Sequence, residues 1–190
     1  MRKKVLKKKE VSSLPLQLQT KRLLFRRYIE DDLLFLQRLV ENPLVMRYIG
    51  DGTVKTIDYA HSLYTRMQEQ YRNFDDYGLH MLIHRETGER IGHAGIVAQV
   101  IDDCFEIELG YWIHPAYWQQ GYAYEAAAAL THYATEECGI ERLVSMIMKG
   151  NSASIRITEK NGFTLEKTIE ADGHEVLIYH LPYSYEETNT

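Results

Sequence analysis

The spacing of apolar residues along the chain predicts helices that alternate with strands. In residues 29–42 the apolar positions recur every three or four residues, which is the period of an amphipathic helix, and Pro43 follows directly. Residues 57–73 repeat this period. Residues 105–113, FEIELGYWI, instead alternate two kinds of side chain, which is the period of a β-strand with two different faces.

The other elements follow from the same patterns and from turn residues. In chain order, we expect a strand pair or bent strand at 16–28, the two helices, three strands within 78–113, a helix at 121–138, a strand at 141–149, a short helix at 151–162 and a hairpin at 163–183. No internal repeat, low-complexity tract or linker interrupts this order. The pattern predicts one domain, residues 16–185, with a mixed sheet and helices on its faces.

Composition narrows the class of protein. A chain of 190 residues with 45% hydrophobic and 26% charged residues suits one globular domain. No apolar run approaches the roughly 18 residues of a membrane span, so no membrane segment is expected. Cys104 and Cys138 lack the spacing of a metal or redox site, and such sparse cysteine usage favours a reducing, cytoplasmic location.

Charge is distributed unevenly along the chain. Residues 1–10 hold six Lys or Arg and one Glu, whereas the formal net charge of the whole chain is −5, so the remainder is strongly acidic. The apolar segment of a signal peptide does not follow, and we expect residues 1–15 to form a flexible basic tail. The acidic remainder favours cationic partners over nucleic acid, for which only the tail offers a contact.

The segment WQQGYAYE is the first candidate for a ligand-binding site. A polar turn follows a strand-like run there, and helix formers begin at Glu125. The first amides of a helix lack partners within it and lie at the positive end of its dipole, so such a turn is suited to phosphate. Small residues at Gly121 and Ala123 let an anion approach those amides. The alternative is a turn that needs glycine only for its dihedral angles.

Three segments together resemble the GNAT superfamily of acetyl-CoA-dependent N-acetyltransferases. The family's phosphate-binding pattern is Arg/Gln-x-x-Gly-x-Gly/Ala; Gly121 and Ala123 match its end, and Trp118 replaces its usual first residue. This replacement, with GYWI before it and Glu-Ala after it, is similar to the Rim-type ribosomal-protein N-terminal acetyltransferases. The other matching segments are TKRLL with Arg26 and Asp31-Asp32, and Asn151-x-x-Ser154 with Asn161-Gly162-Phe163, so the resemblance spans roughly residues 18–180.

The resemblance implies a fold, a cosubstrate and its binding residues. The GNAT fold belongs to the α/β (α+β) class, with a single mixed, mostly antiparallel sheet of about seven strands flanked by about four helices. Acetyl-CoA is the implied cosubstrate, and the transfer needs no metal. The residues implied to hold it are Trp112, Ile113, Gln119, Gln120, Gly121, Tyr122, Ala123, Tyr124 and Asn151. A core position for Trp112 and simple helix capping by Asn151 are the alternative interpretations.

Two carboxylates on the strand at 105–113 are candidates for the general base. Alternation places Glu106 and Glu108 on the same face, which an edge strand with one solvated face would also explain. Rim-type enzymes carry a glutamate directly before the Leu-Gly-Tyr-Trp stretch, so the resemblance implies that Glu108 receives the proton of the amine. Glu106 is the second choice.

The resemblance also implies a general acid for the leaving thiolate. Many GNAT enzymes use a tyrosine seven residues after the asparagine that starts the last helix, but that position is Thr158 here. The Rim-type branch has a serine three residues after the asparagine, which corresponds to Ser154. We therefore expect Ser154 to protonate the thiolate, and the alternative is a helix-start serine without a catalytic role.

The sequence thus predicts a GNAT-type N-acetyltransferase that forms a direct ternary complex with acetyl-CoA and an amine. The favoured acceptor is the N-terminal amine of a protein, of the alanine or serine type found on ribosomal proteins. A small-molecule acetyltransferase acting on a polyamine or antibiotic, and a non-catalytic acyl-CoA-binding sensor, are the alternatives. His80 and His84 share a strand face, but no third ligand has suitable spacing, so no metal is expected. The oligomeric state, monomer or homodimer, stays open.

Overall fold

The computed structural model describes residues 18–73 and 77–182, so the basic tail expected at 1–15 lies outside the described residues. The elements in chain order are β1 (Leu23–Arg26), η1 (Glu30–Asp32), α1 (Leu33–Val40), α2 (Pro43–Met46), α3 (Ile57–Asn73), β2 (Gly78–His84), β3 (Arg90–Ile101), β4 (Cys104–Ile113), η2 (Pro115–Tyr117), α4 (Tyr122–His132), η3 (Tyr133–Glu137), β5 (Val144–Met148), α5 (Ser152–Lys160), β6 (Thr164–Ala171) and β7 (His174–His180).

These elements follow the apolar periods of the sequence closely. α3 occupies the residues expected for the second helix, and α4 continues through the π-helical turn η3 almost to the expected end at 138. Pro43 does more than follow the first helix, because it begins α2. Asn42 caps α2 by accepting a hydrogen bond from the Leu44 amide at 2.9 Å. Proline suits the first helical position because its missing N–H would have no partner there.

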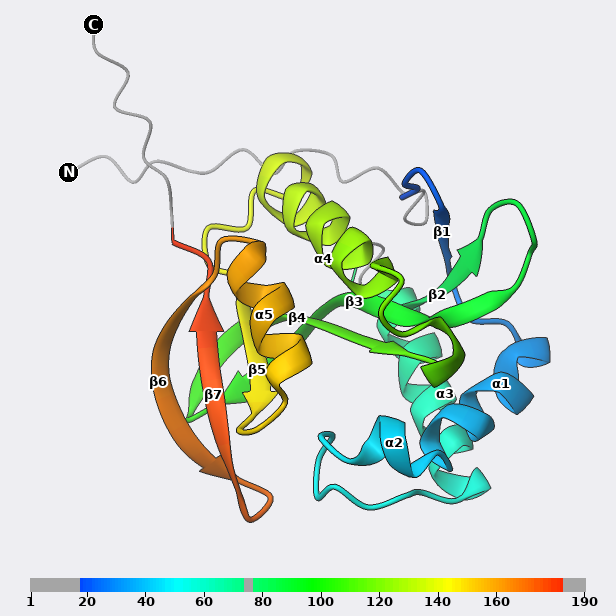
Figure 1. The fold of residues 1–190 in the computed structure, drawn as a ribbon, viewed down its shortest axis with the longest axis horizontal. Coiled ribbons are helices and arrows are strands. Elements are labelled where there is room, and N and C mark those ends of the chain that lie inside the picture. The colour runs from blue at the N-terminus through cyan, green and yellow to red at the C-terminus, as the bar shows by residue number, and fades with distance from the viewer. Residues whose placement is uncertain (1–17, 74–76, 183–190) are drawn as a thin grey trace, which may run out of the picture.

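The seven strands form one sheet in the order β1-β2-β3-β4-β5-β7-β6 (Figure 1). Neighbouring strands are antiparallel except β4 and β5, which run parallel. The expected mixed, mostly antiparallel sheet of about seven strands is therefore confirmed. α4 and α5 cover one face of the sheet, and α1 and α3 lie behind it near β2 and β3 (Figure 1).

Hydrophobic cores lie on both faces of this sheet. One contains Leu109 of β4 with Ala126 and Leu130 of α4. The other joins Met81 of β2 to buried residues of α1 and α3, with Trp112 packed against it. β4 thus contributes alternate residues to opposite cores, as the period of a strand requires. The expectation that Trp112 is a core aromatic is therefore correct in part.

The carboxylate of Asp32 joins the first strand to the first helix. Asp32 is fully buried, and it accepts hydrogen bonds from Arg26 Nη1 at 2.5 Å and from Arg90 Nε at 2.8 Å. Burial alone would raise the pKa of Asp32, but hydrogen bonds from Arg26, the Ile29 amide and Arg90 lower it below its usual value. Since a buried charge needs such partners, the pairing of Arg26 with Asp32 in the sequence has a structural explanation.

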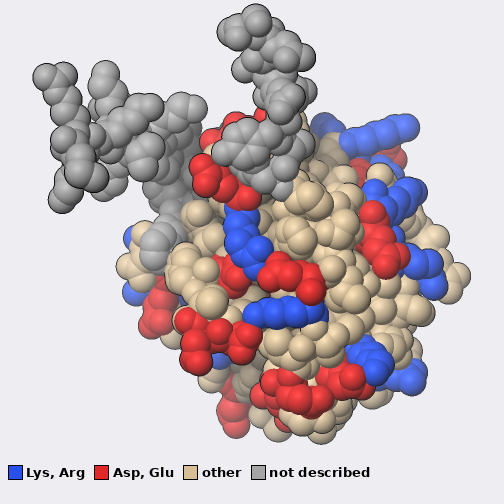
Figure 2. All heavy atoms as spheres, turned by 90° about the vertical axis from the view of Figure 1, so that its left-hand side faces the viewer, with Lys and Arg blue, Asp and Glu red and all other residues tan. Residues whose placement is uncertain are grey.

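Acidic and basic side chains are interspersed on the face that includes the β6 edge of the sheet (Figure 2). Ion pairs hold several of them, such as Arg142 with Glu106 at 2.9 Å and Lys167 with Asp102 at 2.6 Å. Such mixing differs from the one-sign surface typical of nucleic-acid binding. Within residues 18–73 and 77–182, no helix has the length and apolar character required to cross a membrane.

Two glycines that face each other across β3 and β4 give a first test of the packing. A Cβ on Gly95 would lie 2.0 Å from the Gly78 carbonyl oxygen, whereas the nearest atom to a Cβ on Gly110 is 4.0 Å away. We expect Gly95→Ala to lower the free energy of unfolding by about 2 kcal/mol, because the β2 backbone must move. The matched control Gly110→Ala should unfold at or above the wild-type temperature. Equal melting temperatures for the two variants, measured by circular dichroism, would contradict this packing.

Candidate active site

The parallel strands β4 and β5 separate into a fork. They are matched at Glu108 and Val144, and no further bridged pair joins them in the described part of the chain. Beyond this pair, the Ser145 hydroxyl donates to the Leu109 carbonyl at 3.2 Å, and the Met146 amide lies near enough to the Glu108 carboxylate to affect its pKa. Backbone donors and acceptors on the facing edges of diverging strands need partners outside the ladder.

A pocket of about 560 Å³ lies at the open end of the fork. Its walls are α2 with its following loop, the end of β4, the turn before α4 with the first turn of that helix, and one side of α5. Of the residues expected at the site, it is lined by Trp112, Ile113, Gln119, Gly121, Tyr122, Ala123, Tyr124, Asn151 and Ser154. Gln120 is not among them, and its side chain donates to the Ala116 carbonyl at 3.0 Å. Glu108 lies at the fork itself.

The turn before α4 has the backbone geometry of an anion site. Gly121 has a φ of +81° and immediately precedes the helix, and Gln119 also has a positive φ of +59°. The first helical hydrogen bond runs from the Glu125 amide to the Gly121 carbonyl at 3.0 Å, so the amides of the first turn have no partner within the helix. Gly121 is therefore compatible with both interpretations, an anion site and a turn that needs glycine for its dihedral angles. The same positive φ that requires glycine precedes the amides that lack a partner.

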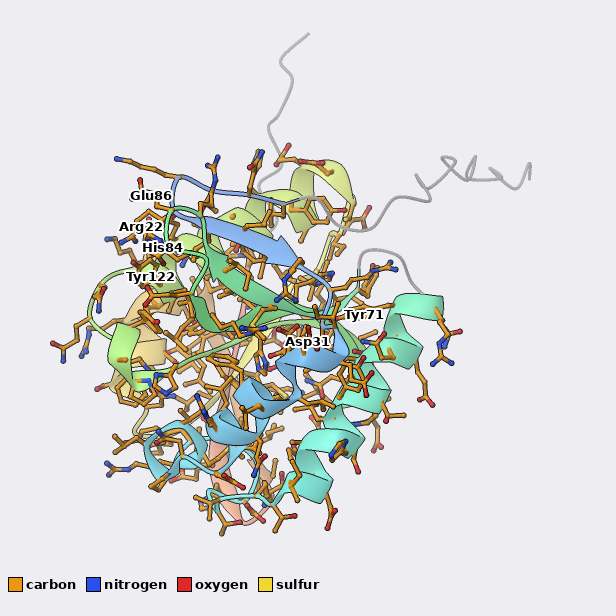
Figure 3. The ribbon with its side chains drawn as sticks, turned by 90° about the vertical axis from the view of Figure 1, so that its right-hand side faces the viewer. Arg22, Asp31, Tyr71, His84, Glu86 and Tyr122 are labelled. Atoms are coloured by element: carbon orange, nitrogen blue, oxygen red, sulfur yellow. The ribbon has the colours of Figure 1, made fainter. Side chains whose placement is uncertain are left out.

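Arg22 and Glu125 form an ion pair beside this turn. The sequence analysis did not predict either residue as part of the site. Arg22 Nε lies 2.6 Å from Glu125 Oε2, and its Nη1 donates to the Gln120 carbonyl at 2.8 Å. The guanidinium also stacks over the Tyr122 ring at 4.2 Å, and Figure 3 shows the two side chains together. Burial would raise the pKa of Glu125, but hydrogen bonds from Thr20 and Arg22 lower it, which keeps this pair charged.

Basic side chains that the sequence reasoning did not identify also line the pocket. Its charged lining residues are Arg47, Arg156 and Lys160. Arg156 and Lys160 are one turn apart on α5, and Lys160 Nζ lies 4.2 Å from the centre of the Tyr124 ring in the first turn of α4. This i, i+4 pair was a signal available in the sequence. The pocket is thus basic within an acidic protein, which suits a ligand with several phosphates.

The structure distinguishes the two glutamates of β4. Glu106 is held by Arg142, whose Nε and Nη2 both lie 2.9 Å from the carboxylate. Glu108 instead accepts a hydrogen bond from Gln99 Nε2. Burial raises the pKa of Glu108 to about 7, although the Met146 amide offsets part of that effect. Glu108 is therefore poised to exchange a proton near neutral pH, whereas Glu106 has a cationic partner.

Three hydroxyl groups lie near one another where α5 packs on β4, namely those of Ser154, Thr158 and Tyr111. Asn151 Oδ1 accepts a hydrogen bond from the Ser154 amide at 3.3 Å, which is the capping role considered for it, while no described group accepts from its Nδ2. Thr158 is buried one turn further along the helix. The hydroxyls of Ser154 and Thr158 face the phenol of Tyr111 from β4 closely enough to offset part of the rise in the Tyr111 pKa that burial causes.

The histidines considered as metal ligands have other surroundings. His80 is buried, and its Nδ1 lies 3.0 Å from the Gly78 carbonyl. Burial lowers the pKa of His80 to about 4, so its ring is neutral at physiological pH. The His84 ring packs edge-on against Tyr122 at 5.9 Å. In the part of the chain that the structure describes, no three His, Cys, Asp or Glu side chains form a group that could hold a metal.

Comparison with known proteins assigns the family. A family model described as an acetyltransferase (GNAT) domain matches residues 22–164, and this chain therefore belongs to the GNAT acetyltransferases. It is 37% identical over 110 residues to the uncharacterized protein YkkB of Bacillus subtilis, a match that covers 57% of this chain and 64% of YkkB. It is 29% identical over 150 residues to the uncharacterized N-acetyltransferase YoaA of the same organism, covering 78% of this chain and 83% of YoaA.

A solved structure shares the fold. RimL, a ribosomal L7/L12 α-N-protein acetyltransferase solved with coenzyme A, superposes with a TM-score of 0.69 at 20% identity, over 85% of this chain and 94% of RimL. At this identity the similarity concerns the fold alone. GNAT enzymes use acetyl-CoA as cosubstrate, and the pocket fits such a molecule in three respects: unpartnered helix-start amides, basic side chains and an open strand fork.

Substitution of the glycine in the turn tests this fit. Gly121→Ala should weaken acetyl-CoA binding about tenfold or more, because strain at the positive φ will displace amides that each contribute about 1.5–3 kcal/mol to a charged partner. Gly139→Ala is the matched control, since Gly139 also has a positive φ, +65°, and has open space around it. Both variants should lose similar stability, and only the first should lose affinity in calorimetric titration. Equal affinity in both would remove the turn from the binding site.

Proposed function

We propose that this protein transfers the acetyl group of acetyl-CoA to a primary amine within a direct ternary complex. The observation that carries the proposal is the fork between β4 and β5. The carboxylate of Glu108 lies at the fork, and the pocket beyond it is lined by the helix-start turn and by Ser154. When bound, acetyl-CoA supplies an activated thioester, and the remaining requirements fall to the residues of this chain.

The first requirement is to hold and orient the cosubstrate. The first-turn amides of α4, with Arg156 and Lys160, are placed to bind its phosphates. Asn151 and the end of β4 line the same pocket, where Asn151 Nδ2 and the backbone amide of Ile113, which alternates with the amides that face β3, offer donors to the pantetheine arm and to the carbonyl that becomes negative during transfer. Holding both reactants in line contributes to the rate because it removes the cost of bringing them together.

The second requirement is to move two protons. Glu108 takes the proton of the attacking amine, directly or through water, because its carboxylate has a pKa of about 7 and no cationic side chain bonded to it. Ser154 lies in the pocket at the start of α5 and gives a proton to the leaving thiolate. Glu106 does not replace Glu108 in this scheme, since its carboxylate is paired with Arg142 at 2.9 Å.

For the acceptor we propose the α-amino group of a protein or peptide N-terminus. Such amines have pKa values of about 7.7–8, whereas lysine-type amines have values of about 10.4. A base with a pKa of about 7 is closer to the first class than to the second. The Rim-type sequence pattern and the fold shared with RimL, an α-N-protein acetyltransferase, also support this acceptor.

A small amine is the second candidate acceptor, and one contact favours it. His174 Nε2 in the β6–β7 hairpin lies 3.3 Å from the Asp51 carbonyl in the loop after α2. Tyr48, in the same loop, lines the pocket and approaches the turn at Gly150. The loop thereby spans from the pocket wall to the hairpin, and an enclosed aromatic pocket suits a small molecule better than a folded protein.

An acceptor panel separates these candidates. Thiol release from acetyl-CoA should occur with peptides that begin with a free alanine or serine. Release should vanish when the same N-termini are blocked, even where the peptides contain lysine, because lysine amines are mismatched with the base. Turnover with polyamines or aminoglycosides alone would establish the small-molecule candidate. Thermal stabilisation by acetyl-CoA without release from any amine would instead support a binding protein without catalytic activity.

The pH dependence tests the role of Glu108. Since the base must be ionised, kcat/KM should rise with pH through a limb centred near the Glu108 pKa of about 7. Glu108→Gln should remove this limb and lower kcat/KM at pH 8 by about a hundredfold or more. A separate limb at the pKa of the acceptor amine, about 8, should remain in both proteins.

Glu106→Gln is the matched control for this experiment. It removes the neighbouring carboxylate on the same strand face, and Arg142 keeps Glu166 as a partner at 3.0 Å. The control should therefore retain the limb near pH 7. Persistence of that limb in Glu108→Gln, or its loss in the control, would transfer the role to another group.

A further inference from the structure

One polar atom beside the proposed acid is buried and has no partner. The phenol oxygen of Tyr111, in β4, is withdrawn from solvent and makes no hydrogen bond of ordinary geometry to any described residue. Buried side-chain oxygens almost always have such a partner, so this one calls for a reason. Tyr111 lines the same pocket as Ser154, and its ring packs against the core below α4. The hydroxyl therefore lies at the edge of the proposed active site.

The surroundings of this phenol are hydroxyl groups from α5. Ser154 and Thr158 are one helical turn apart, and both lie close enough to Tyr111 to influence its ionisation. Thr158 is only 3% exposed and occupies the position where many GNAT enzymes carry their tyrosine acid. The phenol missing from α5 is thus replaced by one that enters the same space from β4.

A lone serine is poorly suited to protonate a thiolate. An aliphatic alcohol is a far weaker acid than a thiol, whose pKa is about 8.5, and donating its proton would leave an alkoxide. A phenol, with a pKa of about 10, is much closer to the thiol. A hydroxyl that gives up one proton while it receives another from a phenol never becomes an alkoxide.

We propose that Tyr111 is a positioning residue that acts through Ser154. In the reacting complex, the Tyr111 hydroxyl forms the hydrogen bond that it lacks in the free protein: it donates to Ser154 Oγ and turns the serine proton towards the leaving sulfur. As the C–S bond breaks, the serine proton moves to sulfur and the phenol proton moves to the serine oxygen. Solvent then reprotonates the phenolate, and the proton that Glu108 took from the amine returns to solvent. An acceptor that arrives as ammonium first releases one proton to solvent, and the relay then converts thioester and neutral amine into amide and thiol with no further net change in protons.

The first test measures the contact in the free protein and so does not depend on turnover. Tyr111→Phe identifies the Tyr111 signal in NMR spectra of protein labelled at tyrosine rings. A hydroxyl that donates to a phenolate lowers its pKa, so Ser154→Ala should raise the pKa of the Tyr111 phenol measurably. Ser152→Ala, whose side chain is exposed on the same helix, should leave it unchanged. An unaltered pKa in Ser154→Ala would overturn the contact.

The second test rests on the proposed transferase function and uses an acceptor on which the wild type turns over. Tyr111→Phe removes a single oxygen and should lower kcat about tenfold or more, with the KM for acetyl-CoA and the melting temperature unchanged or improved. The double variant with Ser154→Ala should be no slower than Ser154→Ala alone, because the two groups act as one unit. Tyr59→Phe, on α3 away from the pocket, should match the wild type.

The outcomes separate the two proposals. A wild type that releases no thiol with any amine defeats the transferase function, while the NMR titration still decides the contact. An active wild type with an equally active Tyr111→Phe overturns the relay and leaves the function intact. Additive losses in the double variant would mean that Tyr111 acts independently of Ser154, which also overturns it.

Discussion

The limited pairing of β4 with β5 is the constraint on which the candidate site depends. The antiparallel ladder between β3 and β4 continues without interruption from Gly92 to Ile101, whereas the parallel pair is matched at Glu108 and Val144 and then diverges. Strands that diverge leave donors and acceptors that still need partners. The Ser145 hydroxyl satisfies one of these groups, the Leu109 carbonyl, and the Glu108 carboxylate lies near another, the Met146 amide.

Strand alternation then divides the chemistry between the two faces of the sheet at this fork. Leu109 and Tyr111 of β4 pack towards α4, whereas Trp112 packs towards the layer of α1 and α3. Glu108 shares the parity of Trp112, so the proposed base and the hydroxyls at α5 reach the fork from opposite sides. In the proposed reaction, the amine adds to the thioester carbonyl and the sulfur leaves the tetrahedral intermediate, so separate groups can serve the two proton transfers.

The sequence predicted those features that depend on local pattern. Apolar periods gave α3 and the strands, and the turn around Gly121 followed from its position between a strand and a helix. Alternation could not separate Glu106 from Glu108, because they share a face, and the difference arises from Arg142, more than thirty positions away. The sequence also could not predict that Tyr111 lies near Ser154, since their proximity depends on how α5 packs on β4. The prediction for Pro43 was incomplete, because a proline after a helix can mark the end of that helix and also begin the next one, as it does in α2.

The contact between Arg22 and Glu125 couples the start of the described chain to the turn before α4 in a thermodynamic sense. Arg22 directly precedes the edge strand β1, which is hydrogen-bonded to β2 on one side, and edge elements are where proteins open locally at least cost. Glu125 belongs to the first turn of α4, which carries the open amides. Fraying of the edge strand therefore loosens the anion site, and any ligand that occupies the turn stabilises the strand by the same free energy. Binding of the cosubstrate and ordering of the first strand are thus thermodynamically coupled.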